Sequence, residues 1–120
     1  MPEKPAVSIE PHAEVVCAVV HCSALDDAAC HEVQREVLSA AAQEPKLPML
    51  LDLTAVKYVP SMGLGTLVML NRKLKDAGRR FLLVGVHPDV RTVLSITRLD
   101  KLFEMHPDRK AALDHLRGTS

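Results

Sequence analysis

The chain has 120 residues, 48% of them hydrophobic, with 15 Lys and Arg balanced by 15 Asp and Glu. A chain of this length has room for one core, so we expect a single domain over residues 1–120. The formal net charge is zero, and the sequence contains no block of charges of one sign. Both features argue against direct binding to nucleic acid or to an anionic bilayer. The partner is therefore expected to be a protein or a small ligand.

The cysteine and aromatic content narrows the possibilities further. Three cysteines, no secretory leader and no apolar run of about 18 residues indicate a reduced, cytoplasmic protein without membrane insertion. With no Trp, two Phe and one Tyr, base-stacking platforms and aromatic sugar sites are hard to build. No cofactor is expected.

The N-terminal region predicts a hairpin. Residues 1–6 hold two prolines and two charges, so these residues and 117–120 are expected to be flexible ends. The β-branched run Val15–Val20 predicts a strand, and Val7–Ile9 is its expected hairpin partner.

An amphipathic helix should follow. Ser23 and Asp26 form a variant capping box at its start, and Pro45 ends it after about Gln43. Apolar residues recur every four positions along it: Leu25, Ala29, Val33 and Val37.

The middle of the chain predicts a buried strand and a second helix. The strand, Leu47–Leu53, is almost entirely apolar, as parallel strands covered on both faces are. The helix after it should end near Gly78. The apolar face of this helix consists of Leu64, Leu67, Val68 and Leu74. Its last turns are basic and contain Arg72, Lys73 and Lys75.

The C-terminal third continues the alternation of strands and helices. It predicts a buried strand over 79–86, a helix opening at His87-Pro88-Asp89, a short strand Lys101–Met105 and a last helix Pro107–Leu116. The expected fold class is α/β: one domain with a mostly parallel, mixed β-sheet of four to five strands and about four α-helices.

The junction Val59–Gly65, VPSMGLG, admits several interpretations. Ser61 could simply be the N-cap of the second helix, which stabilises a helix by about 1 kcal/mol. A nucleotide-binding loop is disfavoured because Val68 replaces the small residue that a dinucleotide fingerprint needs, and no Gly-Lys-Ser/Thr triplet is present. A nucleophile elbow is disfavoured because Val59 stands where its first glycine belongs. A phosphorylation switch at Ser61 is the third interpretation, since the helix N-terminus would stabilise the added charge.

The residues around this junction resemble a known family. Asp52-Leu53-Thr54, Tyr58–Gly65, Asp76-Ala77-Gly78, His87–Val90 and Leu99–Phe103 together resemble the STAS domain of bacterial anti-sigma-factor antagonists, over about residues 7–116. The resemblance implies that Ser61 is the serine phosphorylated by an anti-sigma serine kinase.

Three positions depart from the family pattern. Pro60 replaces the usual Asp, Met62 replaces the usual second Ser, and Arg98 replaces a glycine that often has positive φ.

The resemblance implies a partner-switching regulator of sigma-factor-dependent transcription. The unphosphorylated protein would bind the kinase, and phosphorylation of Ser61 would release it. The expected partner-binding residues are Tyr58, Pro60, Ser61, Met62, Gly63 and Leu64. The rival interpretation is an unmodified docking subunit of another complex, such as an ABC-type lipid transporter.

Other candidate residues favour structural roles. Cys17, His21, Cys22, Cys30 and His31 lack a metal-binding spacing, so no metal site is expected among them. His87 and His106 each precede a proline and are interpreted as turn residues, while Asp26 and Asp27 suit the first turn of a helix. No catalytic residues, and therefore no enzyme, are expected; the oligomeric state stays open.

Overall fold

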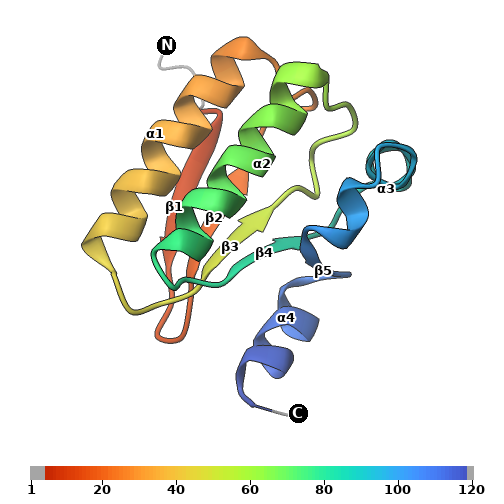
Figure 1. Ribbon diagram of the computed structural model, residues 1–120. Helices are drawn as coiled ribbons and strands as arrows, with labels where there is room; N and C mark the ends of the chain where they lie inside the picture. The colour runs from red at the N-terminus through yellow and green to blue at the C-terminus, as the bar shows by residue number, and fades with distance from the viewer. Residues whose placement is uncertain (1–4, 119–120) are drawn as a thin grey trace.

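Helices cover a five-stranded β-sheet in the computed structural model, which describes residues 5–118 (Figure 1). The elements are β1 (Val7–Pro11), β2 (Val16–Val20), α1 (Asp27–Gln43), β3 (Met49–Asp52), α2 (Ser61–Asp76), β4 (Phe81–Val84), α3 (Pro88–Ile96), a 3₁₀ turn η1 (Leu99–Lys101), β5 (Glu104–His106) and α4 (Arg109–Leu116). The strand order is β1-β2-β3-β4-β5, with β1 antiparallel to β2 and the other pairs parallel. The predicted α/β class is confirmed.

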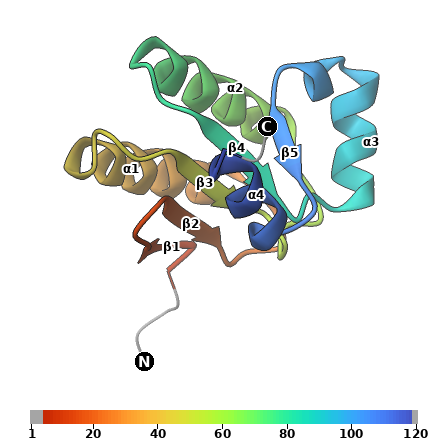
Figure 2. The ribbon, with the colours of Figure 1, turned by 90° about the horizontal axis from the view of Figure 1, so that it is seen from below.

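The two faces of the sheet are covered unequally. Since each parallel strand is added on the same side of the previous one, right-handed crossovers bring α1 and α2 onto one face, where they lie side by side (Figure 1). The short helix α4 packs on the opposite face (Figure 2). Within residues 5–118, no helix combines the length and the apolar character needed to cross a bilayer.

Side chains alternate between the two cores along each central strand. In β3, Met49 and Leu51 pack with the α1–α2 core, while Leu50 packs with the smaller core under α4. This explains why nearly every residue of the central strands is apolar. The polar exception is Asp52, which is 8% exposed at the end of β3.

The three cysteines are divided between the two cores. Cys17 is buried in the core under α4, whereas Cys30 is buried in the α1–α2 core and Cys22 packs against it. Burial raises the pKa of the Cys17 thiol to about 11. Thiols on opposite faces of a sheet cannot share one metal ion, and a buried neutral thiol is a poor nucleophile.

The predicted start of the first helix is wrong. Asp26, not Ser23, is the N-cap of α1, and its carboxylate accepts a hydrogen bond from Ala29 N at 3.0 Å. The backbone of Ser23 instead binds the segment before α2, because its carbonyl accepts hydrogen bonds from Lys57 N and Tyr58 N. The predicted end of the helix, Gln43, is confirmed.

The predicted positions of the last strand and helix also need correction. Leu99–Lys101 forms the 3₁₀ turn, so β5 begins only at Glu104 and runs to His106. His106 is therefore a strand residue rather than a turn residue. The last helix begins at Arg109, because Asp108 caps it by accepting from Ala111 N at 2.8 Å.

The other strands lie where they were expected but differ in length. Leu47–Leu53 contracts to Met49–Asp52 and 79–86 to Phe81–Val84, while the predicted partner Val7–Ile9 extends to Pro11. The expected flexible ends, 1–6 and 117–120, fall partly outside the described residues.

Arg79 has a structural role that the apolar pattern did not indicate. Its side chain is buried, and its guanidinium donates to the carbonyls of Ala41, at 2.6 Å from Nη1, and of Leu47, at 2.8 Å from Nε. These bonds join the end of α1 to the segment that leads into β3.

Candidate functional site

The segment between β3 and α2 is fixed to the chain that precedes α1. Lys57 N and Tyr58 N donate to the carbonyl of Ser23 at 2.7 and 3.1 Å, and Leu25 N donates to the carbonyl of Tyr58 at 3.0 Å. Ala24 and Tyr58 thereby form an isolated parallel bridge. The side chains of Val56 and Val59 are buried beneath the segment. A loop held in this way presents the start of α2 in one defined position.

Ser61 is the first residue of α2 and is exposed. The interpretation of Ser61 as the N-cap is wrong, because Pro60 occupies that position with φ −70° and ψ 174°. Proline has no side-chain acceptor, and among residues 5–118 no side chain caps this helix end. The hydroxyl therefore lies beside uncapped N–H groups at the positive end of the helix dipole.

Large apolar side chains are exposed on both sides of this serine in the chain. Tyr58 is 63% exposed and Met62 is 49% exposed. Pro60 and Leu64 are half-buried. Exposed aromatic and Met side chains are the groups that protein interfaces favour, so Tyr58 and Met62 give the site an apolar docking surface around one hydroxyl.

The two glycines of the junction have different roles. Gly63 is buried, and a Cβ there would lie 2.8 Å from the carbonyl oxygen of Leu25 and 2.8 Å from Val59 Cγ1. Its missing side chain lets α2 approach the segment before α1, so it serves the domain's own packing. Gly65 is exposed, and a Cβ there would meet no described atom within 4 Å. Space for the close approach of a partner therefore exists at Gly65 and not at Gly63.

Beneath the site, Asp52 joins the end of β3 to α4. Its Oδ1 accepts from Thr54 N at 2.9 Å and from Thr54 Oγ1 at 2.6 Å, and its Oδ2 accepts from Arg109 Nε at 3.1 Å. Arg109 also binds Glu10 at 2.8 Å. Burial disfavours the carboxylate, but the hydrogen bonds from Thr54 and the Arg109 charge prevail and lower the pKa of Asp52.

We expect Asp52→Asn to reduce the free energy of unfolding at pH 7 by about 2 kcal/mol, because it removes the carboxylate oxygen that accepts from Arg109 and leaves the Thr54 bonds without a charged acceptor. Since the folded state lowers the pKa, this contribution is present above the ordinary Asp pKa and is lost as the pH falls through the lowered one. Urea unfolding at a series of pH values measures it. The exposed Asp76→Asn serves as control, and an equal effect of both variants at pH 7 contradicts the assignment.

The other positions singled out in the sequence have structural roles. Arg98 adopts the left-handed conformation, with φ 63° and ψ 17°, at the position where the family pattern has glycine. His87 is the N-cap of α3, its Nδ1 accepting from Asp89 N at 3.1 Å. His21 Nε2 lies 2.7 Å from Ser8 Oγ, and His31 is exposed on α1.

The sequence placed Ser61 and Met62 together simply because they are neighbours in the chain. It did not indicate that Ser23 and Leu25 hold the loop, since backbone hydrogen bonds across more than 30 residues leave no local pattern.

Comparison with known proteins identifies relatives of this chain in sequence and in fold. A relative from Thermotoga neapolitana, a homologue of TM1081 assigned as an anti-sigma factor antagonist, is 33% identical over 70 residues, which are 58% of this chain and 62% of the relative. The alignment thus spans less than two thirds of that relative. An anti-sigma factor antagonist from Mycobacterium paratuberculosis is 27% identical, with a TM-score of 0.79 over 92% of each chain.

The Bacillus cell fate determinant SpoIIAA, solved in its phosphorylated form, shares the fold, with a TM-score of 0.69 at 20% identity over 93% of this chain and 100% of that one. The sequence model of the STAS domain matches residues 7–112, nearly the whole of the described fold. The chain belongs to the STAS domain family, alongside relatives that are anti-sigma factor antagonists.

Proposed function

We propose that this protein is an anti-sigma-factor antagonist that binds an anti-sigma serine kinase when Ser61 is unmodified and is released when Ser61 is phosphorylated. By sequestering the kinase it frees a sigma factor, and so regulates transcription from the cytoplasm without catalysing a reaction itself. The observation that carries the proposal is the exposed Ser61 hydroxyl at the uncapped start of α2.

The helix end favours the phosphorylated state chemically. The first turn of α2 contains no acidic residue, so this helix end offers an added phosphoryl group its positive dipole and its N–H donors. In the transfer, Ser61 Oγ attacks the γ-phosphorus of ATP and forms the new O–P bond. The bond from that phosphorus to its bridging oxygen breaks, ADP leaves, and the hydroxyl proton passes to a base on the kinase.

The domain need not change shape for the switch to work. The segment before α2 is held by backbone hydrogen bonds to Ser23 and Leu25, which do not involve the Ser61 side chain. A dianion placed between Tyr58 and Met62 would instead make the apolar docking surface itself unfavourable for the kinase. SpoIIAA, whose fold this chain shares, has been solved both with and without its phosphate.

The expected result with the cognate kinase and ATP is a gain of one phosphoryl group on the intact protein, located on Ser61 by peptide mass spectrometry. Ser61→Ala should gain none, whereas Ser95→Ala, which removes an exposed serine of α3, should be phosphorylated normally. Phosphorylation of Ser61→Ala at the same rate as the wild type would contradict the assignment.

A further inference from the structure

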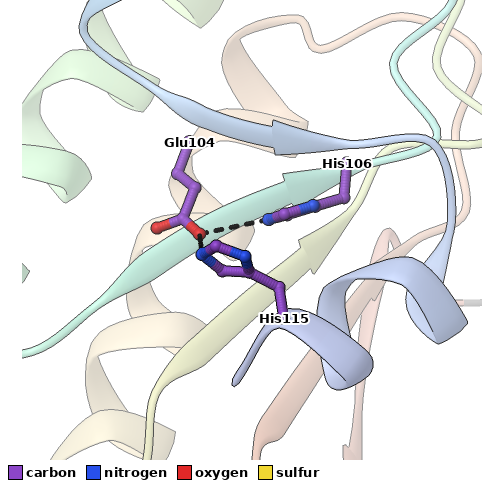
Figure 3. A group of neighbouring side chains, drawn as sticks. All are labelled: Glu104, His106 and His115. Atoms are coloured by element: carbon purple, nitrogen blue, oxygen red, sulfur yellow. Dashed lines mark hydrogen bonds and ion pairs between the residues drawn. The ribbon is translucent and has the colours of Figure 1, made fainter. Parts of the chain in front are cut away.

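Three potential metal ligands converge at the β5 edge of the sheet. Glu104 and His106 come from β5, and His115 comes from α4 (Figure 3). Met105, between the first two, packs with the α1–α2 core, so Glu104 and His106 project to the opposite face, toward α4. The cluster therefore joins the last strand to the only helix on that face among the described residues.

The ligand atoms lie close to metal-binding geometry. Glu104 Oε2 is 3.1 Å from His106 Nε2 and 3.3 Å from His115 Nε2, and the three atoms all lie within 4.8 Å of one another. Ligands about 2.0–2.1 Å from a tetrahedral zinc ion are roughly 3.3 Å apart. Both oxygen–nitrogen distances match this spacing, so only the two imidazoles need to adjust. Their ring centroids are 5.0 Å apart.

The donor set selects the class of metal. Two imidazoles and one carboxylate suit Zn²⁺ and its first-row neighbours, whereas Mg²⁺ and Ca²⁺ prefer ligands that are all oxygen. The His115 side chain is 50% exposed and Glu104 is 31% exposed, so an ion can enter from solvent and keep water in its fourth position.

One residue competes with the metal. Arg80 donates to the same oxygen, Glu104 Oε2, and its side chain is 45% exposed. Its positive charge opposes a divalent cation, but an exposed guanidinium can turn into solvent when the ion binds. The affinity for Zn²⁺ therefore depends on how strongly Arg80 competes with the ion for Glu104 Oε2.

We propose that Glu104, His106 and His115 bind one Zn²⁺ ion, which clamps α4 onto β5. The helix has only eight residues and contributes one fully buried side chain, Ala112, to the core beneath it. An ion held by both elements stabilises the folded state because the unfolded chain does not bring the three ligands together. This site uses no residue of the docking surface and does not depend on the proposed function.

Calorimetric titration of the whole reduced chain with Zn²⁺ should show one saturable site. Thermal unfolding should show a higher Tm with Zn²⁺ than without it. Loss of a ligand should weaken binding at least about 100-fold, beyond the effect of losing an outer-shell partner. His115→Ala is the decisive variant because this side chain is exposed, and His31→Ala, an exposed histidine on α1, is its matched control. Arg80→Gln should bind more tightly than the wild type.

Cobalt(II) provides the second readout. Its visible spectrum should indicate nitrogen and oxygen ligands without a thiolate charge-transfer band, and Cys22→Ser should leave the spectrum unchanged. Equal Zn²⁺ affinity in His115→Ala and the wild type, a thiolate band, or no saturable binding would overturn the proposal and leave the cluster as an ion-pair network. If His115→Ala fails to fold, the comparison of Arg80→Gln with the wild type decides.

Discussion

Ser61→Asp is expected to weaken binding to the cognate anti-sigma kinase about 1,000-fold, which corresponds to roughly 4 kcal/mol. The carboxylate imitates part of the phosphoryl charge and places it in the same exposed segment as the side chains of Tyr58 and Met62. A charge buried in an apolar interface without a partner loses its hydration and gains nothing in return. Fluorescence anisotropy with labelled kinase measures the change directly.

The same substitution should not weaken the domain itself. An acidic side chain in the first turn of α2 interacts favourably with the helix dipole, by about 0.3–1 kcal/mol. Thermal unfolding of Ser61→Asp should therefore give a Tm equal to or above that of the wild type. A loss of kinase affinity without a loss of Tm distinguishes an effect at the surface from misfolding.

Two matched variants complete the test. Ser61→Ala should bind like the wild type, because the hydroxyl is exposed and does not cap the helix. Ser39→Asp adds the same charge to an exposed position on α1 and should not affect binding. If Ser61→Asp binds the kinase as tightly as Ser39→Asp does, the site is a permanent docking element and not a switch.

Periodicity was sufficient to predict the elements of the fold but not their ends. The apolar runs and four-residue repeats identify the strands and helices because burial on a sheet or helix face leaves a local pattern. Helix ends depend on which group caps them. Ser61 and Ser23 both look like N-caps in the sequence, yet Pro60 and Asp26 hold those positions. The Ser23 carbonyl is instead required by the loop before α2.

The two candidate sites also differ in how far the sequence could predict them. The exposed serine and its neighbours form a contiguous stretch, so the sequence was enough to bring Ser61 and Met62 into one surface. The cluster of Glu104, His106 and His115 depends on the register of β5 and on the packing of α4. The sequence did not reveal this cluster, because the predicted last strand began three residues too early and ended at Met105. His106 was therefore interpreted as part of a turn.

Gly85→Ala is expected to reduce the free energy of unfolding by about 3 kcal/mol, because a backbone cost and a steric clash coincide at this glycine. Gly85 has φ +67°, where a Cβ costs roughly 1–2 kcal/mol. That Cβ would also lie 2.2 Å from Thr54 Oγ1 and 3.1 Å from Thr54 Cα, and overpacking of this kind adds about 1–3 kcal/mol. Urea unfolding measures the sum.

Two other glycines separate these contributions. Gly78 has φ +74° but no described atom within 4 Å of its Cβ position, so Gly78→Ala should show the backbone cost alone. Gly65→Ala, in the open face of α2, should stabilise the protein by about 0.5–1 kcal/mol through helix propensity. Equal losses for Gly85→Ala and Gly78→Ala would show that Thr54 yields without cost.

Thr54 is not free to yield, because its hydroxyl donates to Asp52 Oδ1 at 2.6 Å. A Cβ on Gly85 must displace this hydroxyl and so disturb the carboxylate that also holds Arg109. Thr54→Ala removes the hydroxyl in advance, so the double variant should lose less stability than the two single variants together. The β3–α2 loop, and with it the position of Ser61, thus depends on a glycine more than 20 residues farther along the chain.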